Sequence, residues 1–234
     1  MVTQRKMDAE VLMRAMLSIV LAASLAATAP VFAQDPKTED EKVLYALGLA
    51  VSQNLSWFNL TEAELKIVAQ GMSDGVMKKA PKVELQTYGP KIQDLQKTRM
   101  TAVAASEKKA GEAYVAKAAA EKDAKKLPSG VIVTTLKPGT GATPAATDKV
   151  KVHYHGTFTD GTVFDSSVQR GEPASLALDK VIRCWTEGVQ QMKVGGKSRF
   201  VCPSEVAYGD RGAPPRIKPG STLVFEVELL AIEK

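Results

Sequence analysis

The sequence predicts an α+β protein, in which an all-α N-terminal region is followed by a small antiparallel β domain. From Thr38 to about Lys126 the apolar residues recur at helical spacing among Ala, Leu, Lys, Glu and Gln, which are strong helix formers. From Leu127 onward, short runs with an apolar residue at every second position alternate with turns rich in Gly and Pro. One short helical segment interrupts these predicted strands. Helices followed by a run of strands indicate an α+β fold.

Residues 1–33 are expected to form a signal peptide. Arg14 supplies positive charge before an apolar run from Met16 to Pro30, which is too short to span a bilayer comfortably. Suitable residues lie at the −3 and −1 positions of a cleavage site before Gln34. The alternative is an uncleaved membrane anchor. A cleaved signal peptide implies that the mature chain is exported.

Residues 34–82 are predicted to form two helices that carry a dimer interface. Thr38 with Glu41, and Thr61 with Glu64, each match the capping box that begins a helix. Two short helices bury little apolar surface by themselves, so their apolar faces are expected to pack against a second copy of the chain. The alternative is that they pack only on each other or on the C-terminal domain.

Residues 83–126 are predicted to form a long linker helix. Pro90 suits the first position of a helix, and from there to about Lys126 the only helix-weakening residue is Gly111. A helix of this span is about 55 Å long. Its surface is polar on nearly all sides, which is typical of a solvated arm between two domains. The alternative is that its last third is a disordered linker.

Residues 127–234 are predicted to form the β domain, organised around a hairpin at Val150–Ser167. The outgoing strand has apolar residues at alternate positions, and Asp160-Gly161 suits a tight hairpin turn. The return strand brings Phe164 beside Asp165. An aromatic ring next to a carboxylate indicates either the wall of a pocket or a strand that ends in a polar loop.

The chain has two cysteines, Cys184 and Cys202. An even pair in an exported chain favours a disulfide. The alternative is two buried thiols that act as small apolar side chains. Neither cysteine lies in a CxxC motif, so redox catalysis is not indicated.

Charge and polar motifs argue against several other classes of function. The net charge is +5, and basic residues do not cluster with aromatic ones, so nucleic acid is not an expected partner. His153 and His155 lie two residues apart without an evident third ligand, so they are interpreted as surface residues and not as a metal site. Ser166 and Ser167 lack a paired base and are interpreted as turn residues, not as nucleophiles.

Four motifs within residues 127–234 carry a resemblance to a known family. In chain order they are VKVHYHGTFTDGTVFDSS, VIRCWTEGVQQMKVGG, VAYGDRG and STLVFEVELL. Together they resemble the FK506-binding protein (FKBP) family of peptidyl-prolyl cis-trans isomerases. The helical region resembles the dimerisation domain of the periplasmic members, including the macrophage infectivity potentiator type. The resemblance implies an antiparallel sheet wrapped around a short helix, and a homodimer in the periplasm, with association with the outer membrane left open.

The resemblance also implies which residues form the site. Trp185 on the short helix would form the floor of a pocket between helix and sheet. Asp165 would form a polar network at the rim with Tyr154 and Arg170. The backbone N–H of Ile182 and the hydroxyl of Tyr208 would donate to carbonyls of a bound peptide. The implied walls are Tyr154, Phe164, Val181, Ile182, Tyr208, Ile217 and Phe225.

Two positions depart from the pattern of the family. Ala174 follows Pro173 where members often have an aromatic residue, and Arg216 precedes Ile217 where many have an apolar one. Both changes leave the implied pocket more open on one side. They bear on the binding of the macrolide inhibitors tacrolimus and rapamycin more than on the activity.

The reaction of such an isomerase needs no reactive side chain. Rotation about an X–Pro bond crosses a barrier of about 18–20 kcal/mol because amide resonance is lost, but no covalent bond is cleaved. The reaction therefore requires no cofactor, metal or nucleophile; it requires an apolar cavity that favours the twisted amide, and a few donors. The predicted function is X–Pro isomerisation in unfolded or partly folded polypeptides during the folding of exported proteins. The alternative is a dimeric periplasmic chaperone that holds unfolded chains, with isomerisation secondary.

Overall fold

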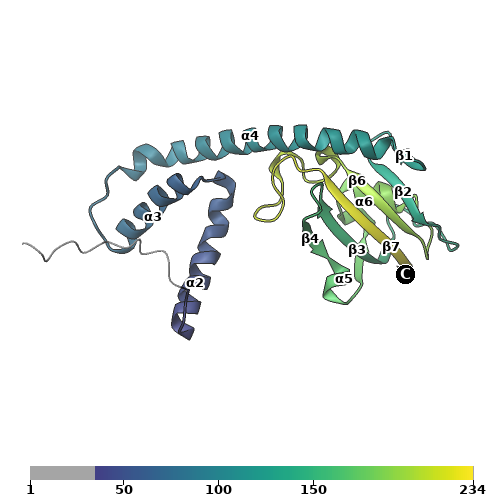
Figure 1. The fold of residues 1–234 in the computed structure, drawn as a ribbon, viewed down its shortest axis with the longest axis horizontal. Coiled ribbons are helices and arrows are strands. Elements are labelled where there is room, and N and C mark those ends of the chain that lie inside the picture. Colours follow the sequence, from purple (N-terminus) through teal and green to yellow (C-terminus); the bar gives the residue numbers. More distant parts are fainter. Residues whose placement is uncertain (1–34, 234) are drawn as a thin grey trace, which may run out of the picture. The chain divides into compact units, whose positions relative to one another are not determined.

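The computed structural model describes residues 35–233 of the chain (Figure 1). The predicted signal peptide, residues 1–33, lies outside the described residues. Within residues 35–233 the boundary between two units lies between Gly48 and Leu49. Among the helices that the structure describes, none is long and apolar enough to cross a membrane.

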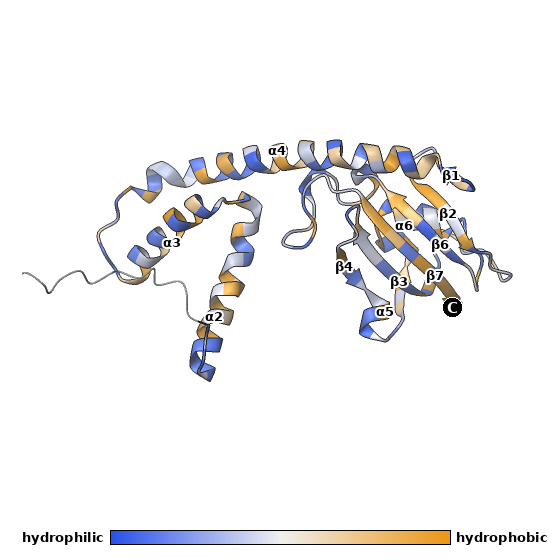
Figure 2. Ribbon diagram, viewed as in Figure 1, coloured by the Kyte–Doolittle hydropathy of each residue, from blue (hydrophilic) through white to orange (hydrophobic). Residues whose placement is uncertain are grey.

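The first described helix, α2 (Glu39–Ser52), exposes its apolar side chains. The predicted capping box begins it, since the Thr38 hydroxyl accepts from the Glu41 N–H at 3.2 Å and the Glu41 carboxylate accepts from the Thr38 N–H at 2.9 Å. No residue of α2, a helix described along its whole length, is buried in a single copy of the chain. Its exposed apolar residues, orange along α2 in Figure 2, include Val43, Leu44, Leu47, Leu49 and Val51.

Two shorter helical elements lead into a long helix. They are the 3-10 helix η1 (Gln53–Phe58) and the α-helix α3 (Glu62–Val76), followed by α4 (Leu85–Ala119). As predicted, Thr61 and Glu64 form the capping box that begins α3. Arg99 of α4 ties these elements together, because its guanidinium pairs with Glu64 at 2.5 Å and donates to the carbonyl of Phe58 at 3.1 Å. The hydrogen bond from Arg99 lowers the pKa of Glu64 to about 2.

The bounds of α4 differ from the predicted ones, Pro90 to about Lys126. The helix begins at Leu85, so Pro90 lies in its second turn, where the missing N–H removes one backbone hydrogen bond but the helix continues. At the other end a left-handed φ of 67° at Asp123 redirects the chain. Ala124–Lys126 then pair with the next strand as β1. The end of the predicted linker therefore belongs to the sheet, because edge pairing competes with continuation of the helix.

A seven-stranded sheet makes up most of the remaining chain. Its order is β1-β2-β6-β7-β3-β4, β5 pairs with β3, and the paired strands are antiparallel. The predicted hairpin is β3–β4, and Gly161 in its turn has a φ of 87°. Helices followed by this sheet confirm the predicted α+β class. The strands are β1 (Ala124–Lys126), β2 (Ile132–Lys137), β3 (Lys149–Phe158), β4 (Val163–Ser166), β5 (Ala174–Ala177), β6 (Lys197–Cys202) and β7 (Leu223–Glu233).

Consecutive residues of a strand point to opposite faces of the sheet, and here both faces carry apolar side chains that other elements cover. On one face Ile132, Val201 and Val224 pack with Ala118 of α4. Their sequence neighbours face the other side and form the main core with the short helix α6 (Arg183–Val189). The long helix was expected to be a solvated arm, but its C-terminal half covers apolar side chains of β2, β6 and β7.

Candidate active site

A cavity of about 420 Å³ opens between α6 and the sheet. Its volume lies within the range of small-ligand sites, about 300–1,000 Å³. Aromatic and aliphatic side chains form most of the lining, and polar groups lie at its edge. The lining residues are Tyr154, Phe164, Asp165, Leu176, Lys180, Val181, Ile182, Trp185, Tyr208 and Phe225.

Trp185 of α6 lies at the centre of an aromatic cluster. Its ring meets those of Tyr154 and Phe225 edge-to-face, each with the ring centroids 5.4 Å apart. Phe164 of β4 meets Phe225 edge-to-face at 5.5 Å. Such pairs contribute about 0.5–1.5 kcal/mol each beyond the area that they bury. Residues from α6, β3, β4 and β7 thus form one rigid apolar surface.

Gly156 of β3 makes room for this cluster. A Cβ atom at this position would lie 2.8 Å from Cζ of Phe164 and 3.1 Å from Cε1 of Phe225. These separations are shorter than side-chain carbons normally adopt, so a larger residue would displace the two rings. The strand pattern alone favours an apolar side chain here, whereas the packing of the rings requires glycine.

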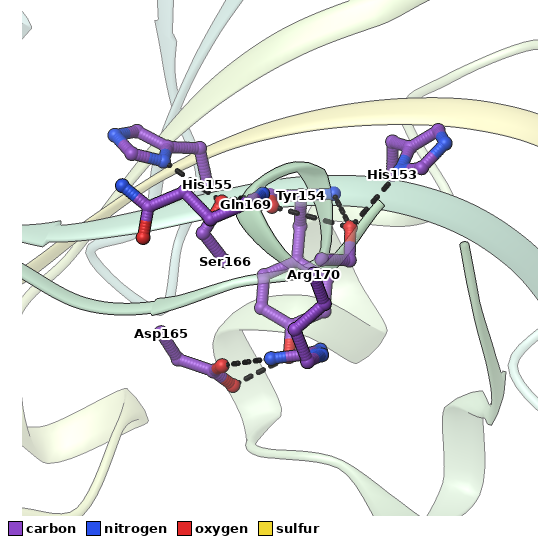
Figure 3. A network of polar contacts seen from close by, with 8 residues as sticks. His153, Tyr154, His155, Asp165, Ser166, Gln169 and Arg170 are labelled. Atoms are coloured by element: carbon purple, nitrogen blue, oxygen red, sulfur yellow. Dashed lines mark hydrogen bonds and ion pairs between the residues drawn. The ribbon is translucent and has the colours of Figure 1, made fainter. Parts of the chain in front are cut away.

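A polar network lies at the rim of the cavity (Figure 3). The Tyr154 hydroxyl donates to Oδ2 of Asp165 at 2.5 Å, while Arg170 pairs with Oδ1 and donates to the Tyr154 hydroxyl at 2.9 Å. Burial acts to raise the pKa of Asp165, but the hydrogen bonds from Tyr154 and Arg170 outweigh it and hold that pKa below its usual range. Burial, followed by the Asp165 carboxylate, raises the pKa of Tyr154, so its hydroxyl remains a donor. The carboxylate and the guanidinium balance in charge.

A single turn of helix, α5 (Ser167–Arg170), directs Arg170 at this carboxylate. Ser166 caps the turn, because its hydroxyl accepts from the N–H of Gln169 at 3.2 Å. Gly171 ends it with a φ of 80°, which glycine adopts without strain. The residues after Phe164 therefore form a turn that places the Arg170 guanidinium at the rim of the aromatic cavity.

The two histidines of β3, interpreted as surface residues, are half-buried and contact Ser166, the N-cap of α5, and Ser167, its first residue. Nδ1 of His153 lies 3.2 Å from the Ser167 hydroxyl, and Nδ1 of His155 lies 3.0 Å from the Ser166 hydroxyl (Figure 3). Ser167 also accepts from the N–H of Tyr154 at 2.8 Å. These contacts join the strand that carries Tyr154 to the turn that carries the cation. Within residues 35–233 no group of three His, Cys, Asp or Glu side chains is placed to hold a metal ion.

Two donors at the cavity are available to a ligand. Within the described residues, neither the backbone N–H of Ile182 nor the hydroxyl of Tyr208 has a hydrogen-bond acceptor. Ile182 is fixed in place as the N-cap of α6, since its carbonyl accepts from the N–H of Trp185 at 2.9 Å. Burial, followed by the Asp165 carboxylate, raises the pKa of Tyr208, so its hydroxyl stays protonated. Both donors can therefore bind carbonyl oxygens.

Comparisons with known proteins agree with this geometry. Residues 141–230 match the family model described as FKBP-type peptidyl-prolyl cis-trans isomerase, and residues 40–132 match the one described as the domain amino terminal to it. The chain is 44% identical to the FKBP-type peptidyl-prolyl cis-trans isomerase FkpA of Aeromonas hydrophila, over 86% of this chain and 81% of that relative. The chain belongs to the FKBP-type peptidyl-prolyl cis-trans isomerases.

Further relatives place this FKBP-type isomerase with proteins of the FkpA and macrophage infectivity potentiator kind. It is 43% identical to the macrophage infectivity potentiator of Trypanosoma cruzi, over 54% of this chain and 65% of that relative. The crystal structure of FkpA from Escherichia coli matches with a TM-score of 0.62 and 36% identity, covering 85% of this chain and 99% of that one. The predicted family, two-domain layout and isomerase activity are confirmed, and the substrates are proline-containing polypeptides.

Most residues that the FKBP resemblance implied for the pocket line the cavity. Arg170 lies in the rim network with Tyr154 and Asp165, the position that the resemblance gave it. Ile217, which was implied as a wall, does not line the cavity: it is buried in the main core and lines a separate small cavity beside α4. Two lining residues were missed, Leu176 of β5 and Lys180 in the 3-10 helix η2 (Leu178–Lys180). Leu176 had a signal, because it is an apolar residue of a strand that pairs with β3. No pattern in the sequence indicated that the charged Lys180 would line the cavity.

A disulfide joins Cys184 of α6 to Cys202 of β6, and both side chains are buried. Of the two alternatives that the sequence left open, the structure has the disulfide. Cys184 directly precedes Trp185, so the bond ties the helix that carries the cavity floor to the sheet of the FKBP-type domain.

Proposed function

We propose that the cavity above Trp185 binds the proline of an X–Pro segment, and that this isomerase acts on polypeptides folding outside the cytoplasm. The observation that carries the proposal is the combination of an aromatic floor with two available donors, the N–H of Ile182 and the hydroxyl of Tyr208. A twisted amide has lost resonance and is less polar than the planar one, so an apolar cavity favours it. Each 1.4 kcal/mol by which the cavity favours the twisted amide over the planar one raises the rate about tenfold.

The proposed roles follow from these positions. Trp185 supports the proline ring, and the donors at Ile182 and Tyr208 hold the backbone carbonyls on either side of the rotating bond. Asp165, kept ionised by its partners, gives the rotating amide a fixed polar rim that needs no rearrangement during the reaction. The walls are assigned to Tyr154, Phe164, Val181, Ile182 and Phe225.

Catalysed isomerisation of a short X–Pro peptide tests this assignment. Trp185→Leu is expected to lower kcat/KM by about tenfold or more, because the edge-to-face cluster loses its central ring. Trp57→Leu is a matched control, since Trp57 lies in η1 and is not among the residues that line the cavity. Equal activity of the two variants would remove the cavity from the mechanism.

We further propose a homodimer formed through residues 34–82. The support is a set of large apolar side chains that one copy leaves exposed, among them Val43 at 65%, Ile67 at 74% and Val76 at 77%. Exposed apolar residues in this number are unusual for a monomer. Sedimentation of the mature chain is expected to give twice the chain mass, and a chain that begins at Leu85 is expected to give the chain mass. A monomeric mature chain would contradict the proposal.

The same exposed side chains favour a second candidate function, a chaperone that holds unfolded chains. If they bind unfolded polypeptide, suppression of aggregation will persist in Trp185→Leu while peptide isomerisation is lost. If both are lost together, the holding activity belongs to the cavity and the second function is withdrawn.

For location and organisation we propose a signal peptide at 1–33, a helical dimerisation domain at 34–82, a linker helix at 83–126 and an isomerase domain at 127–234, in the periplasm. The sheet begins at β1, so the isomerase domain also includes residues assigned to the linker. N-terminal sequencing of the protein from the periplasmic fraction is expected to begin at Gln34. Recovery of the uncleaved chain in membranes would support the anchor instead.

A further inference from the structure

Tyr208 lies in a loop between two short helical turns. These turns are η3 (Ser204–Val206) on one side and η4 (Gly209–Arg211) on the other. Tyr208 is itself in neither turn, and its side chain is 40% exposed. The position of its hydroxyl at the cavity therefore depends on how the two flanking turns are held.

One lysine of α4 contacts both turns. Nζ of Lys108 lies 2.6 Å from Oδ1 of Asp210 in η4 and 3.4 Å from Oε1 of Glu205 in η3. The hydrogen bond to Asp210 raises the pKa of Lys108, so the side chain stays charged across the physiological range. A single ammonium thus spans the two turns that flank Tyr208.

The same face of α4 lies closely against the rest of this loop. A Cβ atom at Gly220, where the loop returns, would overlap the backbone of Ala104. Nζ of Lys218 lies 3.1 Å from the Glu107 carboxylate, one residue before Lys108 on the helix. The N–H of Gly220 donates to the carbonyl of Gly209 at 2.9 Å, which closes the loop on itself. The loop is therefore closed by a backbone hydrogen bond and contacts α4 through Gly220 and Lys218.

We propose that Lys108 is a positioning residue for the isomerase: it fixes the two turns around Tyr208 and thereby aims the Tyr208 hydroxyl at a substrate carbonyl. The long helix is then part of the catalytic domain as well as a connection between domains. The proposal rests on the function proposed above for Tyr208. It deepens that function by placing a group that positions Tyr208 outside the sequence motifs of the family, on α4.

The size of the effect follows from the exposure of the ion pairs. Partly exposed pairs contribute little individually, so neutral Lys108→Met is expected to lower kcat/KM by about two- to fivefold. Lys108→Glu would place three carboxylates together and force the turns apart, so a larger loss of about tenfold or more is expected. The matched control is Lys109→Glu, because Lys109 is the next residue of α4 and its side chain is exposed.

The test is peptide isomerisation by the full mature chain, with thermal unfolding to show that each variant is folded. Lys108→Glu is expected to lose activity, Lys109→Glu to keep it, and Lys108→Glu combined with Asp210→Lys to regain most of it. In a Tyr208→Phe background, Lys108→Glu is expected to cause no further loss, because both changes remove the same hydrogen bond.

Each other outcome is decisive. Equal activities of Lys108→Glu and Lys109→Glu in an active wild type would overturn the positioning role and leave the isomerase assignment standing. An additive loss in the Tyr208→Phe background would show that Lys108 acts on something other than that hydroxyl. An inactive wild type would instead count against the proposed function itself.

Discussion

The hydroxyl of Tyr154 lies 2.5 Å from the carboxylate of Asp165, across the hairpin that joins β3 to β4. Arg170 closes the triangle from α5. This relationship decides between the two interpretations that the sequence left open for Phe164 and Asp165. The carboxylate does not simply end a strand in a polar loop, because it is held at the rim of an aromatic cavity by two donors.

Asp165→Asn is expected to lower kcat/KM by about tenfold or more without unfolding the chain. The substitution keeps the shape but removes the charge that accepts from Tyr154 and Arg170, and hydrogen bonds to a charged group contribute about 1.5–3 kcal/mol each. Peptide isomerisation at neutral pH measures this. Unchanged activity would show that the rim network does not contribute to the reaction.

The same network sets a dependence of stability on pH. The folded pKa of Asp165 lies below its ordinary value, so its stabilising contribution is fully present above the ordinary pKa of about 3.9 and is lost as the pH falls through the folded pKa. The difference in unfolding free energy between wild type and Asp165→Asn should be constant from about pH 8 to pH 5 and shrink below pH 4. A difference in unfolding free energy that grows on acidification would contradict a folded pKa of Asp165 below its ordinary value.

Gly156→Ala is expected to reduce both stability and activity. The added methyl group meets Phe164 and Phe225, and forced overpacking of a core costs about 1–3 kcal/mol. Denaturant unfolding and peptide turnover measure the two effects. Gly89→Ala is the control, because Gly89 lies within α4 with open space around its Cα and gains helix propensity. Wild-type activity of Gly156→Ala would show that the rings can move without consequence.

Loss of the disulfide is expected to lower the free energy of unfolding by about 3 kcal/mol, the value for closing a loop of this length. The bond spans a sequence separation of 18 and both sulfur-bearing residues are buried. Replacing Cys184 and Cys202 together by Ala, and reducing the wild type, should give similar shifts in denaturant midpoint. The double variant should not respond to reductant. Two titratable thiols in the denatured, unreduced wild type would contradict the bond.

A chain that begins at Leu127 is expected to be less stable than one that begins at Leu85. The shorter chain lacks β1 and α4 and so exposes Ile132, Val201 and Val224, which are at most 6% exposed in the whole structure. Burying one such side chain contributes about 1.5–3 kcal/mol, so the loss should reach about 3 kcal/mol or more. Equal denaturant midpoints would show that the helix is dispensable to the domain.

The sequence predicted the strands, the hairpin and most of the cavity because these features rest on local patterns. Alternation marks the inward residues of β3, and the capping boxes at Thr38 and Thr61 mark helix starts that the structure confirms. The aromatic residues of the cavity were identified through motifs, since Phe164, Trp185 and Phe225 are far apart in the chain and periodicity cannot bring them together.

The docking of α4 on the sheet was missed although a signal existed. β2, β6 and β7 contain consecutive apolar residues around Ile132, Val201 and Val224, which indicates strands buried on both faces. Something had to cover the second face, and the Ala-rich end of the long helix was available. The role inferred for Lys108 had no such signal, because its sequence surroundings do not distinguish it from Lys109.

The rate at which the mature chain isomerises a short X–Pro peptide, measured with and without tacrolimus, tests the assigned site most directly. We expect catalysis that tacrolimus inhibits by occupying the cavity over Trp185, and that Trp185→Leu largely abolishes. Catalysis that persists both with saturating tacrolimus and in Trp185→Leu would place the activity elsewhere, and a folded mature chain without catalysis would contradict the isomerase assignment altogether.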